Sequence, residues 1–76
     1  MKDLFVEDAI RTYMEINREY ILEDVKGGNC VESHLVFEYE NKKIHAIVVF
    51  WEDSELKFMY DFEILTDFNL YNVNNN

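Results

Sequence analysis

The sequence predicts an α+β fold in which one N-terminal helix packs on an antiparallel sheet, in the order helix, strand, strand, strand. Three observations predict it. Apolar residues recur at helical spacing over residues 3–25. The spacing then changes to two, the period of a half-buried strand, over residues 31–40 and again over residues 56–65. The chain has 76 residues, no proline and only two glycines, which suits a single folded domain.

The predicted helix has an apolar stripe on one side and charged residues on the other. Asp3 is expected to cap its N-terminus, and Gly27 and Gly28 to end it, because glycine readily adopts the left-handed conformation found after helices. The stripe that should pack on the sheet consists of Phe5, Val6, Ala9, Ile10, Tyr13, Ile16 and Tyr20.

Three strands are predicted, at residues 31–40, 44–52 and 56–65. The first and third alternate between apolar and polar residues, whereas the second is apolar on both faces and is therefore expected to be the central strand. The inner face, under the helix, should carry Leu35, Phe37, Tyr39, Ile44, Ala46, Val48, Phe50, Phe58, Tyr60 and Phe62.

The register of each hairpin follows from matching apolar residues across the strands, because a slip of one residue would turn every side chain to the other face. A two-residue loop at Asn41 and Lys42 pairs Tyr39 with Ile44. A three-residue loop at residues 53–55 pairs Phe50 with Phe58 and Val48 with Tyr60.

The pattern weakens after Thr66. Residues 68–73 are expected to form either a fourth, edge strand or a segment that folds back over the sheet. Asn74, Asn75 and Asn76 have neither charge nor apolar anchor and are expected to fray, so the domain is assigned to residues 1–73.

The outer face of the predicted sheet combines an apolar centre with an acidic surround. A contiguous exposed apolar area on a small protein marks a contact surface, so we expect it to meet a partner, a second copy or the C-terminal segment. The apolar residues are Val36, Ile47, Val49, Trp51 and Met59. The acidic ones are Glu32, Glu38, Asp61 and Glu63, with Glu40, Glu52, Asp53 and Glu55 near the strand ends. The residues assigned to partner binding are Glu38, Glu40, Val49, Trp51, Met59, Asp61 and Glu63.

The spacing of these acids permits mimicry of nucleic acid. Residues two apart on a strand lie about 6.6 to 6.8 Å apart, on the scale of neighbouring backbone phosphates. Glu38 with Glu40, and Asp61 with Glu63, have this spacing.

His45 is expected to lie between Glu38 and Glu63. Ordinary ion pairing explains such a group, while a pH-sensitive contact or a divalent metal site are alternatives. His34 and Ser33 should point to opposite faces and so not form a base and nucleophile. No glycine-rich phosphate loop, paired CxxC motif or zinc-type histidine spacing is present, so we expect no enzyme, cofactor or metal site.

The formal net charge of −9 disfavours nucleic acid and anionic membranes as direct partners and favours a basic protein, although charge of this sign also serves solubility. A single cysteine, Cys30, excludes an internal disulfide, and the charged N-terminal segment is unlike a signal peptide. The longest apolar run is too short to span a bilayer. A cytoplasmic protein is therefore expected.

Small size, acidic charge and the lack of catalytic motifs give the chain a compositional resemblance to phage-encoded antidefence proteins such as anti-CRISPR and antirestriction inhibitors. That resemblance implies an inhibitor that occupies the basic nucleic-acid site of a target protein, in the host cytoplasm. An antitoxin or immunity protein that neutralises a basic toxin is the alternative. A homodimeric interaction module, with the outer face as its interface, is a further one.

Overall fold

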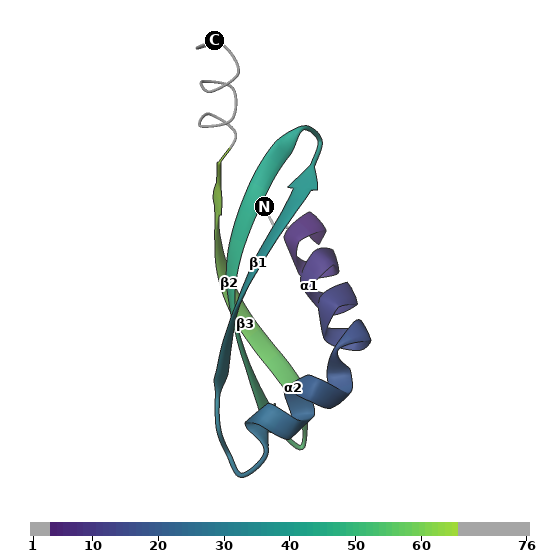
Figure 1. Cartoon of the computed structure of the whole chain (residues 1–76), viewed down its shortest axis with the longest axis vertical. Helices are drawn as coiled ribbons and strands as arrows, with labels where there is room; N and C mark the ends of the chain where they lie inside the picture. Colours follow the sequence, from purple (N-terminus) through teal and green to yellow (C-terminus); the bar gives the residue numbers. More distant parts are fainter. Residues whose placement is uncertain (1–3, 66–76) are drawn as a thin grey trace.

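The computed structural model describes residues 4–65 and places the helices on one side of a three-stranded sheet (Figure 1). The elements are α1 (Leu4–Ile16), α2 (Arg18–Val25), β1 (Val31–Tyr39), β2 (Lys42–Asp53) and β3 (Glu55–Ile64). The strands are antiparallel in the order β1-β2-β3, which confirms the predicted α+β order with a central second strand. The expectations for Asp3, for residues 68–73 and for residues 74–76 lie outside the described residues.

The helical segment is interrupted at Asn17, whereas one continuous helix was predicted. Both the backbone N–H and the side-chain Nδ2 of Asn17 donate to the carbonyl of Tyr13, each at 3.0 Å. Asparagine side chains compete for backbone partners in this way, and such competition disfavours a regular helix interior. Helix α2 accordingly turns away from the axis of α1, toward the far end of the sheet (Figure 1).

The helix stripe that packs on the sheet differs from the predicted one. Ile16 and Tyr20 were assigned to it, but they are 76% and 77% exposed. The buried stripe passes from α1 to α2 through half-buried Asn17. Because Asn17 is polar, the spacing of apolar residues does not show that the stripe continues there. The buried helix residues are Val6, Ile10, Met14, Ile21 and Val25.

The core is built on β2, whose alternate residues Ile44, Ala46, Val48 and Phe50 are fully buried. This confirms the predicted inner face. Partly buried side chains from the two outer strands complete it: Leu35, Phe37, Phe58, Tyr60 and Phe62. Tyr39 is 42% exposed but stacks on Phe5 of α1, with ring centroids 4.4 Å apart.

The first hairpin turns at Glu40 and Asn41, one residue earlier than predicted. Both have positive φ, of 49° and 65°, as a two-residue type I′ turn requires. Tyr39 therefore pairs with Lys42, not with Ile44. The prediction was wrong by two residues in register. It kept the correct faces because a shift of two leaves the alternation unchanged.

The second hairpin has the predicted register, with Phe50 paired to Phe58 and Val48 to Tyr60. The ladder continues into two of the three predicted loop residues, so that Asp53 pairs with Glu55 around Ser54. Ser54 has a φ of 62°.

Helix α2 ends where the sequence predicts. Gly27 and Gly28 have φ values of 81° and 87°, which L-residues with a side chain rarely adopt. The N–H groups of Gly28 and Asn29 donate to the carbonyl of Val25, at 3.2 and 3.1 Å. Backbone donors thus satisfy the end of α2 before the chain enters β1.

Candidate protein-binding face

The sheet face turned away from the helices is here called the outer face. It is formed by alternate residues of the three strands, because successive side chains of a strand point to opposite sides. Its members are Glu32, His34, Val36 and Glu38 from β1; Lys43, His45, Ile47, Val49, Trp51 and Asp53 from β2; and Glu55, Lys57, Met59, Asp61 and Glu63 from β3.

The apolar centre of the outer face is where the sequence predicts it. Val36, Ile47 and Met59 are 61%, 37% and 59% exposed, while Val49 and Trp51 are half-buried. Val49 lies opposite Met59, and Trp51 opposite Lys57. One apolar row therefore follows β2, with exposed members on both neighbouring strands.

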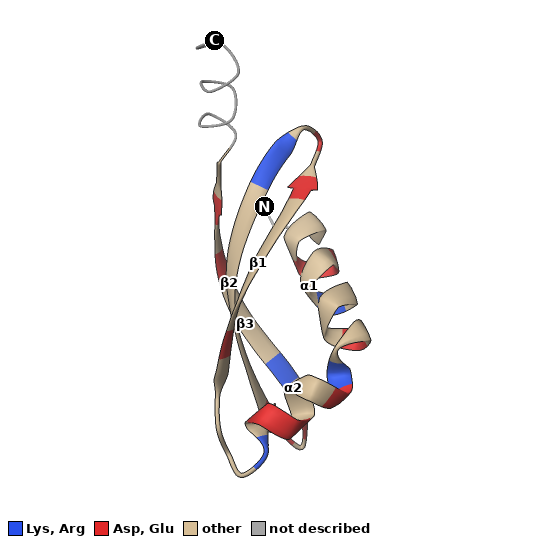
Figure 2. Cartoon of the chain, in the orientation of Figure 1, with Lys and Arg blue, Asp and Glu red and all other residues tan. Residues whose placement is uncertain are grey.

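The acidic residues of the outer face lie mainly on its two flanking strands (Figure 2). Glu38 lies opposite Lys43. Asp61 and Glu63 alternate on β3 as predicted. Glu40 lies in the turn, with left-handed φ, so the strand-like spacing predicted for Glu38 and Glu40 is wrong.

Asp61 and Glu63 each have one carboxylate oxygen held by a hydrogen bond. The backbone N–H of Phe62 donates to Oδ1 of Asp61 at 2.9 Å, and Nδ1 of His45 lies 2.8 Å from Oε2 of Glu63. Among residues 4–65, neither of the other two oxygens makes a further hydrogen bond or ion pair. The two carboxylates are thus oriented in advance, with one oxygen each open to a partner.

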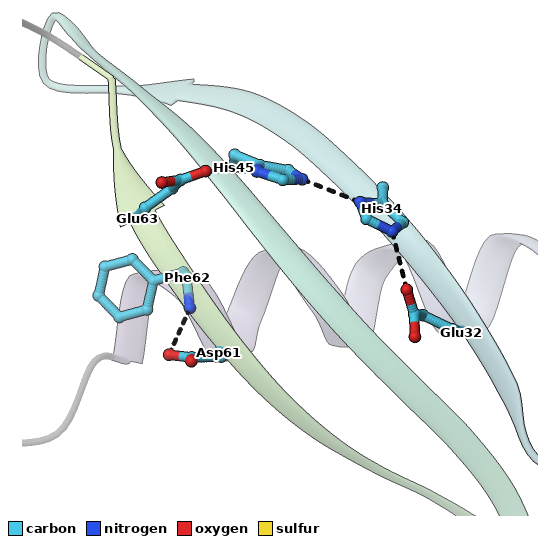
Figure 3. Close-up of polar contacts among 6 residues, drawn as sticks. All are labelled: Glu32, His34, His45, Asp61, Phe62 and Glu63. Atoms are coloured by element: carbon cyan, nitrogen blue, oxygen red, sulfur yellow. Dashed lines mark hydrogen bonds and ion pairs between the residues drawn. The ribbon is translucent and has the colours of Figure 1, made fainter.

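His45 and His34 join two carboxylates in one chain across all three strands (Figure 3). Nδ1 of His34 lies 3.0 Å from Nε2 of His45, and Nε2 of His34 lies 3.0 Å from Oε2 of Glu32. Glu63 completes the chain at the other end, 2.8 Å from His45.

This hydrogen-bonded row of side chains shows that the predicted neighbours of His45 were partly wrong. Its contact with Glu63 was expected, but Glu38 was placed beside it on the basis of the wrong register. In the observed register His45 lies opposite Val36, and His34 is its diagonal neighbour. With the turn placed at Glu40 and Asn41, the sequence would have predicted that His34 and His45 are neighbours.

A shallow groove runs along β3 beside α1. It is lined by Glu7, Arg11, Trp51, Met59 and Tyr60, among others. The Tyr60 hydroxyl donates to Oε2 of Glu7 at 3.3 Å on its helix side. Since Trp51 and Met59 reach its rim, the groove extends the apolar row around the edge of the sheet.

Within residues 4–65, no three His, Cys, Asp or Glu side chains are arranged to hold a metal ion. No helix in that range is long and apolar enough to cross a membrane. No family model, curated protein or solved structure matches this chain. What it binds is therefore inferred from its surface.

Proposed function

We propose that the chain is a non-enzymatic binding protein, an inhibitor that covers the basic nucleic-acid site of another cytoplasmic protein with its outer face. The observation that carries this proposal is an exposed apolar row flanked by carboxylates that are already oriented. Apolar area supplies affinity, whereas fixed charges supply register and partner choice.

The apolar row supplies the anchor. Large side chains at the centre of an interface, tryptophan above all, contribute most of the binding free energy of protein complexes. Trp51 is half-buried against its neighbours, so it loses little conformational freedom on binding. Met59 beside it is exposed and flexible enough to adapt to a partner.

The charges of the outer face favour a basic partner. Six carboxylates stand against two lysines there, Lys43 and Lys57. Lys43 lies opposite Glu38, and Nζ of Lys57 lies 3.5 Å from Oδ2 of Asp53. Asp61 and Glu63 are two residues apart on β3, and two residues of a strand span about 6.6 to 6.8 Å, on the scale of neighbouring phosphates. A site that binds a nucleic-acid backbone offers the complementary array of cations.

A neutralising role toward a basic toxin, as an antitoxin or immunity protein, would use the same surface and remains the alternative. A homodimer through the outer face is less favourable, because a two-fold axis through the apolar row would bring equivalent acidic flanks of the two copies together.

The test compares two double charge reversals. The outer-face variant is D61K with E63K. The matched control is D8K with D24K, which changes the net charge equally at exposed helix positions whose side chains make no hydrogen bond among residues 4–65. Each protein is immobilised as bait in a host lysate and eluted with a salt gradient, and retained proteins are identified by mass spectrometry.

We expect a nucleic-acid-binding protein to be retained by the wild type and the control, released by salt, and lost from D61K/E63K. The apolar anchor is checked with W51A, which should lower the affinity for the captured protein at least tenfold. Equal retention by both double variants would contradict charge mimicry. Recovery of the bait alone as a salt-resistant dimer would favour the homodimeric module.

A further inference from the structure

The hydrogen-bonded row formed by Glu32, His34, His45 and Glu63 fixes which ring nitrogens carry protons. A carboxylate can only accept hydrogen bonds, so Nε2 of His34 must carry the proton that it shares with Glu32. For the same reason Nδ1 of His45 must carry the proton that it shares with Glu63. In neutral rings this leaves Nδ1 of His34 and Nε2 of His45 as two unprotonated nitrogens that face each other.

The two facing nitrogens lie in line with the ring centres. An imidazole ring with bonds of about 1.33 Å places each atom about 1.1 Å from its centre. The ring centres of His34 and His45 are 5.2 Å apart, and the nitrogens are 3.0 Å apart. The nitrogen–nitrogen distance plus one ring radius on each side equals the distance between the ring centres. The two nitrogens therefore lie on the line that joins the centres, the rings meet edge to edge, and their lone pairs point at each other.

A metal ion does not fit between the nitrogens in this arrangement. Half of their separation is well short of the roughly 2.0–2.1 Å of a zinc–nitrogen bond, and lone pairs directed at a metal would converge at an angle. A single hydrogen between them gives a nitrogen–nitrogen hydrogen bond of ordinary length.

We propose that His34 and His45 together carry three ring protons, one more than two neutral rings would, and that the third proton is shared between them. Their contact exists only in this singly charged state. Without the proton, two lone pairs face each other, or one ring turns and releases its carboxylate. With a second proton, two N–H groups face each other and the rings separate. Carboxylates are weaker bases than imidazole, so the shared proton belongs to the rings.

The charged groups around the pair favour keeping one proton. Glu32 and Glu38 face it from β1, Lys43 from β2, and Asp61 and Glu63 from β3; the helices lie on the other side of the sheet. The carboxylates outnumber the lysine, so a single positive charge at the centre is favourable. The side chain of His45 is 22% exposed, and that of His34 is 53% exposed.

The proton sets the charge and order of the outer face, and this consequence rests on the proposed function. Loss of the shared proton makes the face one unit more negative and releases Glu32 or Glu63. Histidine is the side chain that ordinarily changes charge between about pH 5 and 8, and the chain has two histidines, both in this pair. Affinity for a basic partner should therefore rise with pH over this range.

The proton count is tested by NMR on the ¹⁵N-labelled full chain between pH 5 and 9, in the presence of EDTA. In the state with the histidine contact, we expect His34 to be protonated at Nε2 and His45 at Nδ1, with the facing nitrogens sharing a third proton. The two rings should titrate together in two steps. In H34Q, or in H45Q as a second variant, the remaining histidine should titrate in one step. One-step wild-type curves that neither variant changes would overturn the proposal.

The binding consequence is measured separately with decalysine as a basic probe. Wild-type affinity should rise by about two- to fivefold from pH 6 to pH 8, as expected for one exposed charge, and H34Q/H45Q should show no such rise. A flat wild-type profile would overturn the regulatory part of the proposal. Two-step titration combined with equal retention of D61K/E63K and D8K/D24K in the lysate experiment would instead contradict the proposed function and leave the shared proton standing.

Discussion

Two isoleucines six residues apart on α1 should lose very different amounts of stability on the same substitution. Ile10 is fully buried in the core, whereas Ile16 is 76% exposed, although the spacing of apolar residues assigns both to the same stripe. I10A removes three buried carbons, worth about 2.4 kcal/mol in transfer free energy. The cavity that remains raises the expected loss of stability to about 3–4 kcal/mol.

This loss is large against the roughly 4–11 kcal/mol of stability expected for a domain of this size. With an m-value of about 1–1.5 kcal/mol/M in urea, the unfolding midpoint of I10A should fall by about 2–4 M. I16A should stay within about 0.5 kcal/mol of the wild type. If I10A does not fold, I10V should still lose about 0.5–1.5 kcal/mol. Equal destabilisation by I10A and I16A would refute the observed orientation of α1.

Two further substitutions test the turn and the edge of the sheet. E40N combined with N41G supplies the residues that a type I′ turn prefers, and should raise the free energy of unfolding by roughly 0.5–1 kcal/mol in urea titrations. A loss of stability would contradict the turn position. D61A frees the N–H of Phe62 on the exposed edge of β3, and should increase self-association in sedimentation experiments. E55A is its control, and equal association of the two variants would contradict an edge-protecting role for Asp61.

The sheet was predictable because burial imposes a period of two. In β2 the buried residues Ile44, Ala46, Val48 and Phe50 alternate with outer-face residues, and this alternation fixes the face of every side chain. It fixes neighbours less well, because a register shift of two residues preserves both faces. The prediction for the first hairpin therefore assigned each side chain to the correct face but paired the wrong residues across the two strands.

The missed features depend on single polar residues. Asn41 indicates a turn, since asparagine tolerates positive φ, but the sequence does not show whether it takes the first or the second turn position. The helix is interrupted at Asn17, which has φ −107° and ψ 18° and whose side-chain amide donates to the Tyr13 carbonyl; the spacing of apolar residues does not reveal this interruption. The contact between His34 and His45 depends on the turn position, so the prediction that misplaced the turn also missed this contact.

The alternation along β2 also separates two roles within one strand. Even-numbered residues from Ile44 to Phe50 form the buried core, and odd-numbered ones from His45 to Trp51 lie on the outer face that we propose as the binding surface. Exchanges among the odd positions leave the buried set untouched, so natural variation or a randomised library can alter the chemistry of the outer face while the same scaffold persists. The outer face can thus change in evolution faster than the fold itself.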